Sequence, residues 1–419
     1  MYFSGLCKGR FPSGLFYLDK ELMTPHGIKL AAGTGADFFV AVGTSEPFLS
    51  LCENHNLGII SNSNLKPFWW GGDGKNAGEY KHQFPLVNFE NIRNYPSNPS
   101  LWGDYPVDEP NSKDFPHINE IILQYKKRFG NRLPLINLYP FYGRIHCQSK
   151  EEIIMQLGTE TYEEYINQYI KEVDLPYICF DYYPFTSDIN DPLENSFLEN
   201  LDIAAKACRQ TGREMWVILQ AGSWKKDEMP EAHYLEWQLY LSLAFGARAV
   251  IFASYSKGWW AEGTSCVNND GTVNKTYEYV KDLFSVLHSE FGREFLQYEY
   301  LFTKVYGDLD SSDERIRPQF KKQKEKELPD NFPGLTIKSD KAIAAGFFRK
   351  NDSYALLIVN SHNPFCKSIL ANVGITLPEN REIKFYGGLK VSTHNNAFVE
   401  FKLGSGQGVF VSFITKQRF

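Results

Sequence analysis

The sequence has few of the features that mark disulfide-rich, metal-binding or membrane-spanning proteins. Its 7 cysteines are odd in number and scattered without a CxxC spacing, so neither a disulfide framework nor a structural zinc site is expected. The 9 histidines are equally dispersed, and we expect no metal and no cofactor. No run of about 18 apolar residues occurs, so no membrane span is predicted.

An excess of positive charge is missing too. The formal net charge is -6 at pH 7, whereas a nucleic-acid-binding face needs clustered Lys and Arg, so no nucleic acid partner is expected. The first residues, MYFSGLCKGRF, lack the apolar region of a secretory signal. We therefore expect a cytoplasmic protein, or a periplasmic or secreted one if a leader segment has been removed.

Two motifs of other enzyme classes are also absent. There is no GxSxG elbow, which argues against a serine hydrolase of the usual kind. No glycine-rich phosphate-binding turn follows a predicted strand, because the GTGAD sequence at Gly33 precedes one.

What the chain does have is size and aromatic side chains. Its 419 residues, 43% hydrophobic and 22% charged, suit a soluble protein with one barrel of about 250 residues and a smaller domain. The aromatic content of 15% is high. Aromatic rings stack on the flat C–H faces of sugars, although they also fill a large core.

Strand and helix patterns alternate through the first three quarters of the chain. Apolar runs typical of buried strands occupy residues 37–43, 58–61, 101–108, 133–141, 177–185, 213–224 and 248–255. Helical patterns occupy residues 117–129, 161–173, 197–210, 231–245 and 277–296, with a weak one at 86–98. This alternation predicts parallel βαβ units. One further strand within residues 1–33 would complete a (β/α)8 TIM barrel, and a doubly wound open sheet is the alternative.

The pattern changes after residue 297. Residues 308–335 are charged and contain prolines, and they are followed by AIAAGFFR, SYALLIVN, REIKFYG, NAFVEFKL and GVFVSFIT. Short β-rich runs separated by turns are typical of an antiparallel sandwich. We therefore predict a catalytic barrel over 1–297, a charged linker or loop over 298–335, and an all-β sandwich domain over 336–419.

Acidic residues lie where two of the predicted barrel strands end. The stretch LWGDYPVDEP runs from Leu101 into Asp108 and Glu109 and then Pro110, and Asp181 begins the second half of the later strand pattern YICFDYYPF. Catalytic groups of parallel barrels gather at the carboxyl ends of the strands. The alternative for Asp108 and Glu109 is a structural one, in which acids stabilise the positive end of the following helix.

These stretches carry a resemblance to a known class of protein. The succession GDYPVDEP, LPLINLYP, FDYYPF, WQLYLSLAFGARAVIFASY and NNDGTVNKTYEYVKDLFSVL resembles the (β/α)8 glycoside hydrolases of the large retaining clan, particularly bacterial proteins related to β-galactosidases. The run from GFFRKNDSYALLIVN to LGSGQGVFVSF is similar to the β-sandwich that follows the barrel in many of them. The resemblance spans residues 37–415 and implies an oligosaccharide or polysaccharide substrate.

The resemblance also implies roles for particular residues. The family has Asn-Glu-Pro or a similar sequence at the end of strand four, with the Glu as general acid/base; the matching residue is Glu109, preceded by Asp108 where Asn is usual. The family's nucleophile is a Glu at the end of strand seven, where this chain has Gln220. An amide cannot form the glycosyl ester, so the second carboxylate must come from elsewhere.

Three acids are candidates for that second carboxylate, namely Asp181, Glu262 and Asp108. We prefer Asp181, because it lies on a strand and is followed by tyrosines; its alternative role is a structural acid bonded to them. Glu109 is then expected to donate the proton and Asp181 to activate water or attack the sugar. The expected substrate-binding residues are Asn137, Tyr139, Tyr183, Gln220, Trp102, Trp224, Trp259, Trp260 and Glu262.

Two functions remain open at this level. The first is a glycosidase that uses carboxylate acid/base catalysis, and the second is a non-catalytic carbohydrate-binding barrel that has lost the strand-seven nucleophile. A structural or assembly module would need an exposed apolar patch, which a sequence does not display. We expect a monomer or a small homo-oligomer.

Overall fold

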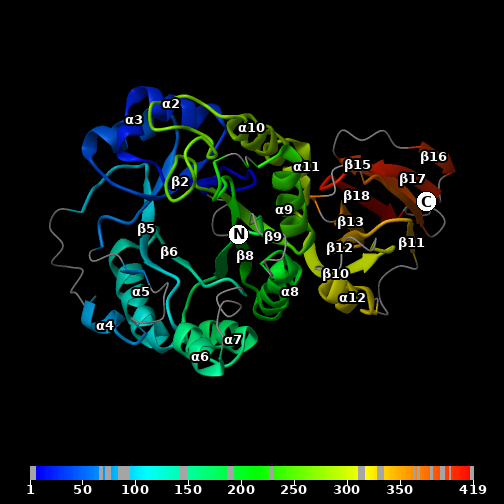
Figure 1. Ribbon diagram of the computed structural model, residues 1–419, viewed down its shortest axis with the longest axis horizontal. Coiled ribbons are helices and arrows are strands. Elements are labelled where there is room, and N and C mark those ends of the chain that lie inside the picture. Colours follow the sequence, from blue (N-terminus) through cyan, green and yellow to red (C-terminus); the bar gives the residue numbers. More distant parts are fainter. Residues whose placement is uncertain are drawn as a thin grey trace.

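The computed structural model describes residues 6–65, 69–70, 77–83, 95–141, 149–185, 193–226, 228, 230–309, 317–327, 335–362, 364–365, 369–377, 381–386, 392–395 and 398–415. Two lobes lie side by side in Figure 1. The larger is a ring of strands with helices around it, and the smaller is built from the β-strands of the C-terminal part.

The larger lobe is a (β/α)8 barrel. Its strands are β1 (Ser13–Phe16), β2 (Phe38–Val42), β3 (Gly58–Ser61), β5 (Leu101–Asp108), β6 (Leu133–Asn137), β7 (Tyr177–Tyr182), β8 (Glu214–Gln220) and β9 (Ala247–Ala253). Parallel pairing runs from β6 through β5, β3, β2, β1, β9 and β8 to β7, and a bridge between Leu138 and Phe180 joins the two ends. The predicted barrel is confirmed, and the open sheet is excluded. The expected strand within residues 1–33 is β1.

Helices cover the outside of this ring. They are α2 (Pro25–Gly33), α3 (Glu46–Asn54), α4 (Tyr80–Gln83), α5 (Phe115–Phe129), α6 (Lys150–Leu157), α7 (Tyr162–Glu172), α8 (Leu193–Thr211), α9 (Ala232–Ala244), α10 (Lys275–His288) and α11 (Glu290–Phe295). Helix α5 shows why they form, since Ile118, Ile121, Ile122 and Tyr125 repeat at helical spacing and are buried. The short strand β4 (Trp69–Trp70) pairs with the end of β5.

Some helices differ from the sequence prediction. The long helix expected at 277–296 is two helices, because the Ser289 hydroxyl accepts a hydrogen bond from the Phe291 N–H and begins α11. Helix α6, capped by Ser149, was not anticipated. Of the weak helix expected at 86–98, residues 86–94 lie outside the described residues, and residues 95–98 are not helical.

The smaller lobe is an antiparallel β-sandwich. One sheet has the order β10 (Glu299–Tyr306), β12 (Ile343–Lys350), β13 (Ser353–Asn360), β18 (Gly408–Thr415) and β15 (Arg381–Tyr386). The other has the order β11 (Thr336–Ser339), β14 (Ala371–Thr376), β17 (Phe398–Leu403) and β16 (Ser392–Asn395). Buried side chains such as Phe347, Leu356 and Phe401 form a core of their own, as in other sandwiches.

The segment expected as a linker contains regular structure. Strand β10 lies within residues 298–335 and pairs with β12, and helix α12 (Arg317–Lys324) follows it. The sandwich therefore begins directly after α11. The strand was not predicted because charged residues surround β10 in the sequence and obscure the pattern of its buried and exposed positions.

The two lobes meet at helix α9, most of whose residues from Leu235 to Ala244 are buried. It packs against β8 and β9 of the barrel and against β12 and β13 of the sandwich, and it lies between them in Figure 1. A Cβ at Gly346 would come within 2.0 Å of the Ala244 carbonyl oxygen, so this close approach requires glycine. The Thr303 hydroxyl donates to the same oxygen at 2.9 Å.

A buried acid connects several elements at the end of the barrel where the strands begin. Asp37, which is 1% exposed, accepts hydrogen bonds from the Arg10 guanidinium and, at 3.1 Å, from the Ser13 N–H. His288 Nε2 lies 3.2 Å from Asp37 Oδ2, the oxygen that also accepts from Ser13, whereas Arg10 binds Oδ1. One carboxylate thus connects the N-terminal segment, β1, β2 and α10.

We predict that Asp37→Ala lowers the free energy of unfolding by about 3 kcal/mol, because it removes the shared partner of several buried polar groups. Chemical denaturation of the purified protein measures this. Glu278→Ala is the control, since Glu278 forms only an exposed pair with Lys281 at 3.2 Å and should change stability by less than about 1 kcal/mol. Equal effects of the two variants would contradict the assigned role of Asp37.

Candidate active site

A single side-chain amide joins two carboxylates at the end of the barrel where the strands terminate. Asn137, the last residue of β6, donates from Nδ2 to Asp108 Oδ1 at 2.9 Å and to Asp181 Oδ1 at 2.7 Å. Asp108 ends β5 and Asp181 lies next to the end of β7. Because both oxygens bond to one nitrogen, they lie within about 6 Å of each other, which includes the separation of about 5 to 5.5 Å typical of retaining glycosidases.

These three residues are largely shielded from solvent. Asn137 and Asp181 are 3% and 5% exposed, and Asp108 is half-buried. Burial raises the pKa of Asp108, and hydrogen bonds from Tyr105, Asn137 and the Glu109 N–H act against that rise. Two close, buried carboxylates favour a state in which one of them keeps its proton. The pair is therefore suited to holding one proton between its two carboxyls.

Glu109 lies beside the pair on a strained turn. Its backbone φ is 45°, which is unfavourable for a residue with a side chain, so β5 ends at Asp108 and does not continue through Glu109. The Glu109 N–H donates to the Asn137 carbonyl at 2.8 Å, and the Tyr165 hydroxyl donates to the Pro110 carbonyl at 2.7 Å. The turn is thus fixed on both sides, and the half-buried Glu109 side chain lies at the rim.

Tyr183 connects the acids to a group of aromatic rings. Burial raises the pKa of Tyr183, and the charges of Asp181, Asp108 and Glu109 raise it further, so all three acids lie near its hydroxyl. The Tyr183 ring contacts Trp259 and Trp260, with centroids 6.1 and 5.2 Å apart.

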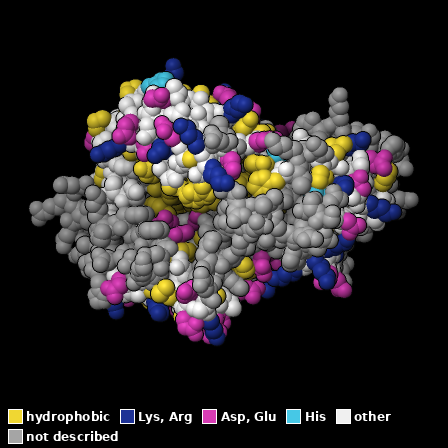
Figure 2. Space-filling model, in the orientation of Figure 1, with side chains coloured by type: hydrophobic (Ala, Val, Ile, Leu, Met, Phe, Trp, Pro, Cys, Tyr) yellow, Lys and Arg dark blue, Asp and Glu magenta, His cyan; other side chains and the backbone are white. Residues whose placement is uncertain are grey.

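A second line of contacts reaches the same place from β1. Trp259 packs edge-on against Phe16 at 5.9 Å, and Phe16 packs against Tyr105 at 5.7 Å. Tyr105 is the residue whose hydroxyl stabilises the Asp108 carboxylate. In Figure 2, hydrophobic side chains border acidic ones in a hollow of the larger lobe. Acids beside exposed aromatic rings are an arrangement suited to sugars.

Two predicted site residues have other contacts. Trp102 lies at the start of β5, at the end of the barrel remote from Asp108, where its ring covers Gly58 and contacts Phe38. Gln220 ends the seventh barrel strand as expected, but its amide donates to the Phe185 and Gly222 carbonyls and accepts from the Phe185 N–H. With its side chain 0% exposed, Gln220 orients the loops around it.

The remaining predicted residues lie at varying depth. Tyr139 is 2% exposed and packs against Tyr165. Glu262 is exposed on the loop that follows Trp260. Trp224 is 48% exposed, and its ring packs edge-on against Trp260 with centroids 4.4 Å apart. The structure thus brings Trp224, Trp259 and Trp260 together next to Tyr183.

Three aromatic residues near the acids were not anticipated. Phe16 and Tyr17 lie at the end of β1, in a part of the sequence too rich in turns for a strand to be assigned. Tyr105 lies within the predicted strand, but its orientation depends on an irregularity in the pairing of β5 with β6 between Asp104 and Val107. The sequence signal for β1 was the run SGLF, which is too short to assign a strand.

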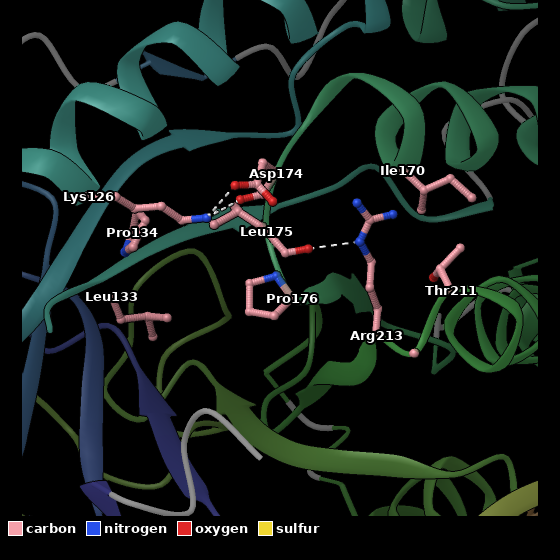
Figure 3. A pocket seen from close by; sticks show the side chains of 10 residues that line it. Lys126, Leu133, Pro134, Ile170, Asp174, Leu175, Pro176, Thr211 and Arg213 are labelled. Atoms are coloured by element: carbon pink, nitrogen blue, oxygen red, sulfur yellow. Dashed lines mark hydrogen bonds and ion pairs between the residues drawn. The ribbon is translucent and has the colours of Figure 1, made fainter. Parts of the chain in front are cut away.

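A cavity of about 600 Å³ lies at the other end of the barrel. Figure 3 shows its lining, where the Lys126 ammonium points to Asp174 and the Arg213 Nε–H points to the Leu175 carbonyl. These distances are 3.0 and 2.8 Å. Both cationic side chains of the cavity therefore bind the loop before β7. Residues at this end of a barrel usually contribute to stability and not to catalysis.

Within the described ranges, no group of three or more His, Cys, Asp or Glu side chains is placed to hold a metal ion. No helix in the same ranges is long and apolar enough to cross a bilayer.

We predict that Asp108→Asn stabilises the folded protein above neutral pH. The raised pKa of Asp108 means that the folded state binds the proton more tightly than the unfolded state, so stability falls as pH rises from the unfolded pKa through the folded one. The amide removes this dependence. Thermal unfolding at pH 5 and pH 8 should therefore show a smaller loss in the variant than in the unmodified protein.

The exposed Asp282 of α10 provides the control for this measurement. Asp282→Asn should leave the difference between the two melting temperatures unchanged. A variant at Asp108 that melts with the same difference as the unmodified protein would contradict the inferred cost of burying this charge.

Known structures share this architecture. A glycoside hydrolase has a TM-score of 0.53 at 10% sequence identity, covering 98% of this chain and 93% of its own. A GH42 β-galactosidase from G. stearothermophilus has a TM-score of 0.52 at 8% identity, covering 96% and 98%. No family model and no curated protein sequence matches the chain. At this identity the likeness concerns the fold, and the chain has the barrel-and-sandwich fold of these glycoside hydrolases, as its motifs predicted.

Proposed function

We propose that the protein is a glycoside hydrolase in which Asp108 and Asp181 flank the glycosidic bond. The observation that carries this proposal is the Asn137 amide at the end of β6, which donates to both carboxylates near the ends of the two flanking strands, β5 and β7. Two carboxyls at such a separation are what double-displacement hydrolysis requires. They do not depend on a carboxylate at Gln220, so the amide at strand seven is compatible with activity.

The different surroundings of the two acids suggest their roles. Burial raises the pKa of Asp108, which suits the acid that protonates the departing glycosidic oxygen. Asp181 then attacks the anomeric carbon, and the bond to the leaving group breaks as the glycosyl ester forms. Water next attacks the ester while Asp108 accepts its proton, so both carboxyls return to their initial state.

Glu109 is the acid that the family resemblance identifies as proton donor. It lies next to Asp108, and its charge acts on Tyr183 together with those of the pair. Its rim position would suit a donor to a leaving group that points out of the barrel. Asp108 is our first assignment because its hydrogen bonds join it to Asp181, and Glu109 is the alternative for the same step.

Three amide variants test these roles. We expect Asp108→Asn and Asp181→Asn each to lower kcat/KM on aryl glycosides by about 10³-fold, because an amide neither donates a proton nor forms the ester. Glu109→Gln should keep most of the activity if Asp108 is the donor. The assay is release of the aryl group from a panel of glycosides, and Asp282→Asn serves as the control.

The outcomes separate the candidate functions. A loss in Glu109→Gln with normal activity in Asp108→Asn would transfer the donor role to Glu109. If the unmodified protein binds oligosaccharides but cleaves none of the panel, the hydrolase proposal fails and the non-catalytic binding barrel is the better description.

Asn137→Ala should change the pH dependence of activity in a defined direction. Its hydrogen bond lowers the pKa of Asp108, so removing it raises that pKa and moves the basic limb of the profile of kcat against pH to higher pH. A merely structural residue would change the amplitude of the profile and leave its limbs in place. Measurement of kcat from pH 4 to pH 10 decides between these results.

A further inference from the structure

The exposed aromatic rings at the rim extend away from the carboxylates. The large apolar side chains that are well exposed in the described part of the chain are Leu123, Met155, Trp224, Trp259, Val273 and Leu370. The two aromatic ones, Trp224 and Trp259, follow the neighbouring strands β8 and β9. Trp260 packs against both, with centroids 4.4 and 5.6 Å away.

The positions of these rings differ with respect to the acids. Trp259 contacts Tyr183, which follows β7 two residues after Asp181. Trp224 contacts Trp260, and no ring contact joins it to Tyr183 in the described residues. Trp259 is therefore the inner ring and Trp224 the outer one, with the buried Trp260 between them.

The position of Trp260, between the two exposed rings, depends on a glycine. A Cβ on Gly222 would lie 2.3 Å from Trp260 Cδ1, so a larger residue would displace the indole. With glycine there, Trp260 is 2% exposed and provides the surface against which Trp224 packs.

Hydrogen bonds hold the two rim loops rigidly. Ser223, which precedes Trp224, donates its N–H to Thr264 Oγ1 at 3.0 Å, and its carbonyl accepts from the Ala261 N–H at 2.8 Å. On the other side, Gly258 donates its N–H to Asp19 Oδ2 at 3.3 Å, and the Asp19 N–H donates to Ser256 Oγ at 2.8 Å. The loops after β1, β8 and β9 therefore form one connected support.

A half-exposed indole on a rigid support is suited to ligand binding. Such a ring loses little conformational freedom when a ligand stacks on it, so most of the contact energy is retained. Trp224 is 48% exposed, whereas Trp260 on the neighbouring loop is 2% exposed. A sugar ring with an open C–H face is the ligand that a flat, uncharged, exposed aromatic ring binds.

We propose that Trp224 forms an outer sugar-binding subsite and that the substrate is a chain of several sugars. The chain extends from the carboxylates past Trp259 and over the rim of β8 to Trp224. This inference rests on the proposed function for the position of the cleaved bond. It adds the substrate class, which is an oligosaccharide or polysaccharide with unsubstituted ring faces, and the direction in which that chain leaves the site.

Chain-length dependence tests the subsite. We expect Trp224→Ala to lower kcat/KM by about tenfold for the longer members of a series of gluco-, galacto-, manno- or xylo-oligosaccharides, because one stacking contact contributes about 0.5–1.5 kcal/mol. The same variant should cleave an aryl monoglycoside as the unmodified protein does, because that substrate is too short to reach Trp224. Trp224→Phe should restore much of the loss.

Leu123→Ala is the matched control, since Leu123 is 47% exposed on α5, away from the rim. The subsite is rejected if Trp224→Ala changes kcat/KM by the same factor for the monoglycoside and the longest oligosaccharide, or leaves both unchanged. These results leave the hydrolase proposal intact, because the monoglycoside is still cleaved. If no glycoside is cleaved, the same oligosaccharides are titrated calorimetrically. Trp224→Ala should then weaken the binding of the longest oligosaccharide more than that of the shortest.

Discussion

The arrangement of the site depends on the two hydrogen bonds donated by the Asn137 side chain. In the ring of strands, β6 lies between β5 and β7, so a short side chain at its end can reach acids on both neighbours. Asp108 and Asp181 would repel each other if both were charged, and their separation is set by the amide between them. A carboxylate at position 137 would add to the repulsion, and an apolar residue would remove the donor that the two acids share.

The rest of the rim follows from how the strands end. Tyr17 and Glu109 both have positive φ, so β1 and β5 end abruptly and present side chains at the rim. The aromatic residues Phe16, Tyr183 and Trp259 come from three different strands or loops, and the Trp259 ring contacts both of the others. Burial raises the pKa of Asp108, and a hydrogen bond in such a low-dielectric environment is stronger than one in water. The sandwich lies apart from the carboxylates, since its strands contact the barrel through the outer helices α8 and α9.

Sequence patterns predicted the scaffold better than the site. Runs such as FFVAV and GIIS are buried strands in any parallel barrel, and the structure has β2 and β3 there. The family motif predicted Glu109 as the proton donor, whereas the acid that shares the Asn137 amide with Asp181 is Asp108. The pairing irregularity in β5 and the turn with φ 45° at Glu109 decide which of the two acids faces Asp181. The seven-residue pattern of β8 located Gln220 correctly at a strand end, but only coordinates reveal that its amide is used by the backbone of neighbouring loops. Trp102 was misjudged because a sequence does not show which end of a strand faces the substrate.

The central claim is that Asp108 and Asp181 act as a pair on one glycosidic bond. Its most direct measurement is to trap the protein with a fluorinated, slowly released aryl glycoside and to locate the label by mass spectrometry of the digested chain. The account predicts one glycosyl group attached to Asp181, in the peptide that contains β7, and no label in Asp181→Asn. Label on Glu109 or on a residue outside the site, or turnover that inverts the anomeric configuration without any label, would contradict it.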